Sequence, residues 1–213
     1  KTKDLIWDYP VSSYIYPFGS IAANVGEITN TGVEFTINAV PVQTKNFTWS
    51  TTLNLSHNKN TVDKLSNDIY KTSTFAQGDP MVAGVSANGW TQRIMEGEPL
   101  GTFYTYEWAG YNADGVSEYY TRDENGNRDG GTTTDPDYKD RTITGCAQPK
   151  LNLGWNNTVN YKNWDFSCFF TGVFGHKVYN GLRAHYTAPD FFAGGKNVMK
   201  EFVNERSPKD TGS

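Results

Sequence analysis

The sequence has no long apolar run, few cysteines and little excess charge, and each shortage excludes a class of protein. No stretch approaches the roughly 18 consecutive apolar residues of a transmembrane helix, so none is expected. The two cysteines, Cys146 and Cys168, are too few for a disulfide framework. Lysine and arginine number 19 against 23 acidic residues, with no basic stripe among aromatics, which argues against nucleic acid as a partner.

Motifs of catalysis and metal binding are also missing. The sequence contains no G-x-S-x-G elbow, no H-E-x-x-H pair and no phosphate-cradling loop. His57, His176 and His185 are too far apart for the spacing of a metal site. Glu96 and Glu98 are a carboxylate pair of the kind that glycosidases use, but nothing in the sequence places them around a cleft. We therefore expect a protein that is not an enzyme.

Aromatic residues, in contrast, are abundant. They make up 15% of the chain, although only 37% of it is hydrophobic and the mean hydropathy is −0.62. A soluble globular protein of this composition would have few apolar residues to bury. Ordering each residue costs about 1–2 kcal/mol of backbone entropy, which apolar burial must offset. The combination suits the wall of a membrane β-barrel, in which only alternate residues face lipid.

Two pairs of segments alternate between apolar and polar residues with the period of a β-strand. Residues 33–40 and 46–58 are predicted to form one hairpin, joined by a short polar connection at 41–45. Residues 151–161 and 164–171 are predicted to form a second hairpin around Lys162 and Asn163. These strands are about as long as the ~9–11 residues that a tilted strand needs to cross a bilayer. Trp49, Tyr161 and Trp164 stand at strand ends, where an interfacial girdle of aromatics is expected.

The polar faces of these segments distinguish two architectures. They carry Asn, Ser and Thr rather than the Lys, Glu and Arg that keep a soluble surface in solution. The pattern favours an all-β fold, the antiparallel strands of a transmembrane outer-membrane β-barrel with a water-filled interior. The alternative is a soluble β-sandwich that binds carbohydrate. Whether the side chains of the first hairpin face lipid or an opposing sheet decides between them; those side chains are Phe47, Trp49, Leu53 and Leu55.

Residues 59–150 form a long connection between the two hairpins, and this connection is rich in Gly, Asn, Asp and Thr. A loop of this length usually holds structure of its own, and residues 102–111 and 117–122 are predicted to form a short hairpin around a turn at 112–115. Short turns on one side and one long excursion on the other are typical of an outer-membrane barrel, so this loop region is expected to be extracellular.

Aromatic side chains gather in this loop region and are its best candidates for contact with a ligand or a partner protein. Rings with polar tips stack on sugars and anchor protein interfaces. The alternative is that they pack the loop against itself or against a partner. The candidates are Trp90, Tyr104, Tyr106, Trp108, Tyr111, Tyr119 and Tyr120.

An acidic stretch at 122–131 resembles a calcium loop. Asp123, Asn125, Asn127 and Asp129 alternate as oxygen ligands do in such a loop. The position that requires glycine is Arg128, and the twelfth position is Thr134 rather than glutamate. A solvated acidic turn is therefore favoured, calcium is kept as the weaker reading, and no other cofactor is expected.

A series of short motifs resembles one family. The motifs are N-x-G-x-I-x-N-x-G-V-E-F at 24–35, N-L-S-H-N-K-N at 54–60, E-G-E-P-L-G-T-F-Y at 96–104, D-x-N-G from Asp123 and D-R-x-x-x-G from Asp140. In this order, over roughly residues 1–186, they resemble the SusC/RagA family of TonB-dependent outer-membrane transporters.

The resemblance implies a large barrel with an N-terminal plug in the outer membrane of a Gram-negative bacterium of the Bacteroidetes. It further implies import of glycans or oligopeptides, powered by TonB and assisted by a SusD-like surface lipoprotein. No plug or TonB-contacting segment is recognisable here. Residues 1–213 are therefore expected to be the C-terminal part of the barrel domain, with TonB contacting a missing N-terminal part.

Overall fold

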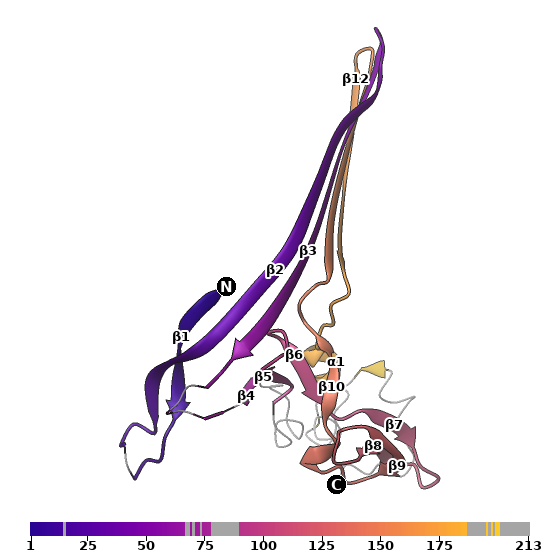
Figure 1. The fold of residues 1–213 in the computed structure, drawn as a ribbon. Helices are drawn as coiled ribbons and strands as arrows, with labels where there is room; N and C mark the ends of the chain where they lie inside the picture. The colour runs from indigo at the N-terminus through magenta and orange to yellow at the C-terminus, as the bar shows by residue number, and fades with distance from the viewer. Residues whose placement is uncertain are drawn as a thin grey trace. The chain divides into compact units, whose positions relative to one another are not determined.

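The computed structural model describes residues 1–14, 16–66, 69, 71–72, 74–77, 90–186, 195, 197 and 199–200. The chain divides into two compact units (Figure 1). Unit 1 comprises residues 1–74, 95–100 and 146–177, and unit 2 comprises residues 75–94, 101–145 and 178–213. Among the described residues, no helix has both the length and the apolar character needed to cross a membrane.

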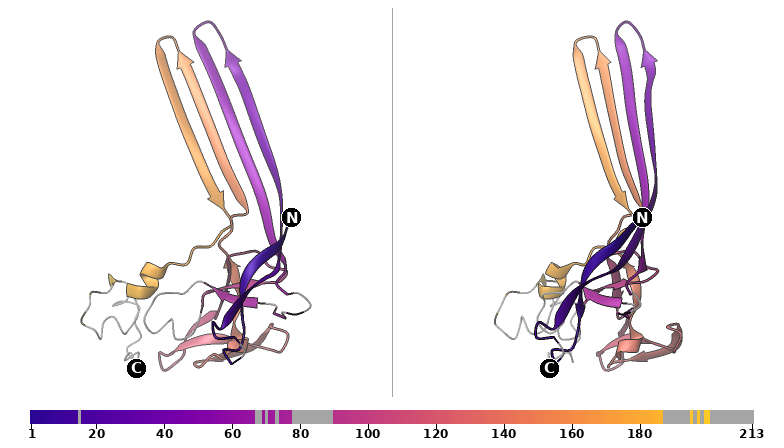
Figure 2. Two further views of the ribbon diagram at one scale, coloured as in Figure 1. Left: turned by 90° about the vertical axis from the view of Figure 1, so that its left-hand side faces the viewer. Right: turned by 60° about the vertical axis from the view of Figure 1, so that its left-hand side comes forward.

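Unit 1 is built on a five-stranded antiparallel sheet in the order β1-β2-β3-β11-β12. Its strands are β1 (Thr2–Pro10), β2 (Ser20–Gln43), β3 (Phe47–Lys64), β11 (Leu151–Tyr161) and β12 (Trp164–Phe174). The hairpins β2–β3 and β11–β12 are far apart in sequence, yet β3 pairs with β11 along ten residues, from Ser56 opposite Asn152 to Phe47 opposite Tyr161. The two hairpins therefore run side by side as one surface (Figure 2).

The register of these four strands sorts their side chains into two faces. Residues directly opposite each other share a face, and successive residues alternate between faces. The apolar face holds Val33, Phe35, Ile37, Phe47, Trp49, Leu53, Leu55, Leu153, Trp155, Val159, Tyr161, Trp164, Phe166 and Phe170. The polar face holds Glu34, Thr36, Asn38, Thr48, Ser50, Thr52, Asn54, Ser56, Asn152, Asn156, Thr158, Asn160, Asp165 and Ser167. Exceptions include Phe169 and Val173 on the polar face and Asn157 on the apolar face. The predicted alternation is confirmed.

The connection within the first hairpin is shorter than predicted. β2 continues to Gln43, so Pro41 lies inside the strand rather than in the connection. The ladder tolerates this proline because the β2–β3 register shifts between Ala39 and Val42, and an irregularity of this kind needs no backbone N–H at every position. The turn then closes with a hydrogen bond from the Thr44 N–H to the Phe47 carbonyl. In the second hairpin, β11 has the predicted bounds and β12 extends three residues beyond Thr171.

Among the described residues, no second layer covers the apolar face. Trp155 is 42% exposed, Phe170 53% and Trp164 78%. The buried apolar side chains of unit 1 lie instead near the other end of β2 and β3, at Ala23, Val25, Val62 and Leu65. The long hairpins therefore lack the opposing sheet that a β-sandwich requires.

Two smaller sheets lie mainly in unit 2. One has the order β10-β6-β5-β4, with β10 (Thr142–Cys146), β6 (Thr102–Thr105), β5 (Gln92–Met95) and β4 (Thr74–Gln77). The other has the order β7-β8-β9, with β7 (Trp108–Tyr111), β8 (Ser117–Arg122) and β9 (Arg128–Thr133). A 3-10 turn, η2 (Tyr138–Asp140), and a short helix, α1 (Gly181–Tyr186), complete the described elements.

The predicted loop hairpin is correct for residues 108–111 and 117–122 but not for residues 102–105. β7 pairs with β8 around residues 112–115, as expected. Residues 102–105, however, form β6 and pair with β5 instead. The described part of the region 59–150 thus consists largely of short strands, which explains how so long a connection stays ordered.

Candidate ligand and partner surface

Trp108 and Tyr111 form an exposed aromatic pair on β7. Three residues apart on a regular strand, they would point to opposite faces. The β7–β8 register shifts by one residue between Trp108 and Gly110, and Gly110 has a φ of 126°, a conformation that favours glycine. This bulge places both rings on one face, 5.4 Å apart and edge to face, with exposures of 55% and 48%.

Four other predicted aromatics are engaged with arginines or with each other. Tyr106 packs edge-on against Tyr119 at 6.0 Å and lies 4.8 Å below the Arg141 guanidinium. The Arg128 guanidinium stacks 3.7 Å above the Tyr120 ring. Tyr104 lies 5.6 Å from the Arg93 guanidinium, and the same guanidinium is 5.0 Å from Tyr138. These rings stabilise the fold of unit 2 through cation–π and ring contacts.

Trp90 belongs with the exposed pair rather than with the packed rings. Its side chain is 47% exposed, and its carbonyl accepts a hydrogen bond of 3.2 Å from Arg141 Nη1. Of the seven predicted aromatics, the structure thus leaves the rings of Trp90, Trp108 and Tyr111 open to an incoming molecule. Tyr104, Tyr106, Tyr119 and Tyr120 are each only partly exposed.

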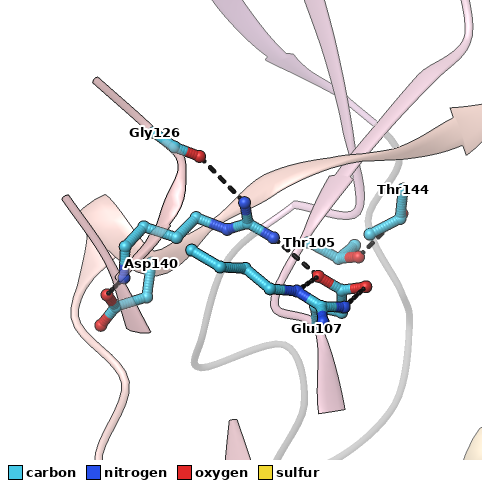
Figure 3. A network of polar contacts seen from close by, with 7 residues as sticks. Thr105, Glu107, Gly126, Asp140 and Thr144 are labelled. Carbon is cyan, nitrogen blue, oxygen red and sulfur yellow. Dashed lines mark hydrogen bonds and ion pairs between the residues drawn. The ribbon is translucent and has the colours of Figure 1, made fainter. Parts of the chain in front are cut away.

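Glu107 is the centre of an ionic network beneath this surface (Figure 3). Its Oε2 accepts hydrogen bonds from Arg122 Nη2 at 2.7 Å and from Arg128 Nε at 3.1 Å, while Oε1 accepts one from Arg128 Nη2. The Arg128 contact is bidentate, the strong geometry for a guanidinium and a carboxylate. Hydrogen bonding from Arg128, reinforced by Arg122, lowers the pKa of Glu107 below its ordinary value.

Arg122 and Asp140 connect this network to the 3-10 turn. Arg122 is only 8% exposed, and its Nη1 donates to the Gly126 carbonyl. The buried Asp140 carboxylate accepts from the Arg122 backbone N–H at 3.0 Å (Figure 3) and also from the Asp137 N–H at 2.9 Å. The second of these bonds is part of a capping box at η2. The buried Asp140 carboxylate is therefore satisfied, whereas the Arg122 guanidinium is satisfied through Nη1 and Nη2 but keeps a buried Nε that has no hydrogen-bond partner among the described residues.

Sequence reasoning did not identify this network. Glu107 stands in a run of aromatics, and Asp140 and Arg141 were noted only as part of a family motif. The sequence offered one clue, namely charged residues such as Glu107 and Arg122 within segments rich in aromatic side chains. Pairing between residues 15 and 21 positions apart in sequence could not be read from that signal.

The predicted calcium ligands form a tight turn. One oxygen of Asp123 accepts hydrogen bonds from the backbone N–H groups of Asn125 and Asn127, each at 2.9 Å. The Asp129 carboxylate accepts from the Thr121 hydroxyl and the Gly131 N–H, and these bonds lower its pKa. Throughout the described residues, no three His, Cys, Asp or Glu side chains are grouped closely enough to hold a metal ion.

The polar face of unit 1 contains a shallow hollow of about 380 Å³. Glu34, Thr36, Asn54 and Ser56 line it from one hairpin, and Asn152 and Gly154 from the other. The side chains are bridged across strands, for example by the Thr36 hydroxyl, which donates to Asn54 Oδ1 at 2.9 Å. This face is therefore hydrogen-bonded, neutral over most of its area and suited to contact with water.

Comparison with known proteins supplies the context for this geometry. The chain is 33% identical over 219 aligned residues, covering 99% of its length, to TonB-dependent receptor P3 of Formosa agariphila. It is 30% identical over 84% of its length to TonB-dependent receptor SusC of Bacteroides thetaiotaomicron. Searched against family models, it matches none. The chain spans about a fifth of each curated relative, 21% of P3 and 17% of SusC.

Solved structures give the same fold. The chain superposes on the structure of the RagAB peptide transporter with a TM-score of 0.68, at 23% identity, covering 88% of this chain and 19% of that one. The RagAB peptide importer in its open-open state gives the same TM-score of 0.68. The antiparallel strands of unit 1 are thus strands of an outer-membrane β-barrel, as predicted.

Proposed function

We propose that this chain, as a member of the SusC-type TonB-dependent receptors, supplies wall strands and outer loops to a transporter that imports glycans or oligopeptides across the outer membrane. TonB would supply the energy through another part of the protein, and a SusD-like lipoprotein would cover the outer opening. The observation that carries the proposal is the uncovered apolar face of four paired strands, backed by a hydrogen-bonded polar face.

The physical chemistry of a barrel wall requires both faces. Lipid offers no hydrogen bonds, so every backbone group in the membrane must be paired within the sheet, at a cost of several kcal/mol for each group left unpaired. The ladder β2-β3-β11-β12 pairs these strands with one another, and further strands of a full-length barrel would pair the open edges of β2 and β12. Its apolar face suits contact with acyl chains, and its polar face suits a wet lumen.

The relatives favour transport over the alternatives. They are named as receptors and as a peptide transporter, which points to a protein that is not an enzyme. A soluble carbohydrate-binding sandwich is not favoured, because such a fold would cover Trp155 and Phe170 with a second sheet. RagAB is a peptide transporter, and for this chain peptides and glycans are both proposed as substrates.

The exposed aromatics of unit 2 are proposed to contact the partner lipoprotein or the substrate. Trp108 and Tyr111 present large, rigid rings whose apolar area is uncovered. Burying an aromatic side chain of this kind supplies much of the binding energy at interfaces. Trp90 is assigned the same role on the same grounds, whereas the four packed tyrosines are assigned to the fold of the loops.

Cross-linking in the full-length receptor tests this proposal. A photo-reactive amino acid replaces Trp108 or Tyr111 in living cells, and Lys162 in a short turn serves as the control position. We expect Trp108 and Tyr111 to cross-link to a surface lipoprotein or to a fed glycan or peptide, identified by mass spectrometry, and Lys162 to give neither. A receptor that never reaches the outer membrane, or that leaves nutrient uptake unchanged when its gene is deleted, would refute the transport function.

A further inference from the structure

A second hollow lies in unit 1 at the end of β3 away from the short turns. It has a volume of about 220 Å³. His57 and Lys59 from β3 and Lys150 before β11 line it, together with Pro99, Cys146 and Pro149. A hydrogen bond of 2.5 Å between His57 Nδ1 and the Lys150 carbonyl fixes the two sides of the hollow relative to each other.

The charge of this hollow is positive. Two lysines and a histidine line it, and no aspartate or glutamate does. Among the described residues, the ion pairs of Lys1 with Glu27 and Asp63 lie elsewhere in unit 1, and neither Lys59 nor Lys150 has a carboxylate partner. Two unpaired ammonium groups above an apolar floor favour an anionic group attached to an apolar body.

The position of the hollow indicates which molecule brings that anion. The β2–β3 register runs without interruption from Ile37 opposite Leu53 to Thr31 opposite Lys59. Alternation therefore puts His57 and Lys59 on the apolar face, directly beyond Leu53 and Leu55, while Asn58 and Asn60, which also line the hollow, lie on the polar face, so the hollow reaches the apolar face through His57 and Lys59. In a barrel whose long loops are extracellular, this is the depth of the outer-leaflet headgroups.

We propose that the hollow binds the phosphate group of an anionic lipid of the outer leaflet. Lys59 and Lys150 would hold the phosphate oxygens, and the proline and cysteine walls would contact the start of an acyl chain. The site would anchor the receptor at a fixed depth beside one bound lipid. The inference rests on the orientation given in the proposed function.

Native mass spectrometry of the full-length receptor in detergent tests the site with dioleoyl phosphatidic acid as the probe. One lysine near an anionic lipid surface contributes about fivefold in affinity, so Lys59→Gln or Lys150→Gln should each weaken binding about fivefold, and the pair roughly 30-fold. Lys59→Arg should retain binding. Lys162→Gln, which removes a lysine from a short turn, should leave it unchanged.

Two further arms identify the ligand. Dioleoylglycerol, which lacks the phosphate, should bind no better to the wild type than to the double variant. Inorganic phosphate at equal concentration should not displace the phosphatidic acid, and displacement would overturn the lipid assignment in favour of a free anion. Unchanged lipid binding by a correctly folded double variant would overturn the site itself. Heat-modifiable migration on gels reports barrel assembly separately, so a failure of the barrel is distinguishable from a failure of the site.

Discussion

An arginine placed on one face of β12 should unfold the barrel, and an arginine on the next residue should not. Phe170 lies on the apolar face near the middle of β12, 53% exposed, with its ring 5.5 Å from Trp155. Thr171 lies on the polar face opposite Gly154, which has no side chain to obstruct it. Phe170→Arg and Thr171→Arg therefore introduce the same side chain one residue apart on opposite faces, and only Phe170→Arg also removes a ring contact.

The structure sets the size of the difference. An arginine on the lipid face of a barrel costs about 2–4 kcal/mol at the membrane midplane. Loss of the contact with Trp155 adds about 0.5–1.5 kcal/mol, since paired aromatic rings contribute that much beyond their buried area. Phe170→Arg should thus cost about 3–5 kcal/mol in the free energy of unfolding. Thr171→Arg should stay within about 0.5 kcal/mol of the wild type, as substitutions in contact with water usually do.

Guanidinium unfolding of the full-length receptor, reconstituted in liposomes and followed by tryptophan fluorescence, measures both values. Phe170→Leu, which keeps an apolar side chain, should lose only the ring contact and so separates packing from charge. If Thr171→Arg proved as destabilising as Phe170→Arg, or more so, the assignment of the apolar face to lipid would be wrong, and with it the barrel orientation.

Further predictions concern the loop network, the β2–β3 ladder and the bulge. Glu107→Ala should raise the hydrogen-exchange rates of β8 and β9, which corresponds to a loss of about 1–2 kcal/mol in the free energy of local opening. The buried Arg122 loses a charge-assisted partner, and the 35% exposure of Glu107 reduces the effect. The Arg128 and Arg122 contacts lower the Glu107 pKa, so this protection should be complete above the ordinary carboxyl value of 4.5 and should be lost as the pH falls through the lowered pKa. In Glu107→Gln, exchange rates corrected for their intrinsic pH dependence should show no such loss of protection. Gly32→Ala should lower the free energy of unfolding in guanidinium by about 1–3 kcal/mol, since the added Cβ would lie 2.7 Å from the His57 carbonyl oxygen. Thr31→Ala, the control, should match the wild type. Deletion of Ala109 should remove the bulge and leave Trp108 and Tyr111 two residues apart on a regular strand, so both positions should still cross-link; loss of cross-linking from position 111 alone would contradict this register.

The fold of the hairpins was predictable because strand alternation is a local property. Phe47, Trp49, Leu53 and Leu55 recur at every second or fourth position, and the same pattern in residues 151–161 gave the bounds of β11 directly. The strand that contains Pro41 was cut short, because a proline predicts a break unless a bulge is known to accommodate it. Pairing between β3 and β11 joins segments roughly a hundred residues apart, and no local pattern specifies it.

The candidate surface was predictable in composition but not in arrangement. The aromatic residues of the loop region were predicted as a group, and their role as a contact surface stays a prediction. Which rings are open depends on the Gly110 bulge and on the arginines that cover Tyr106 and Tyr120. The Glu107 network was missed because an ion pair depends on distance in space rather than on spacing in sequence.

The sequence alone determined that the chain is a two-faced β-structure with an aromatic-rich connection between its hairpins, because alternation and composition act between neighbouring residues. The order of the motifs along the chain also indicated the SusC-type receptors, a family that the comparisons then supported. Tertiary structure decided that two remote hairpins form one sheet, that no layer covers its apolar face, and that Lys59 and Lys150 meet at one hollow. These features depend on register and on long-range pairing, which the chain acquires only when distant backbone groups bind each other.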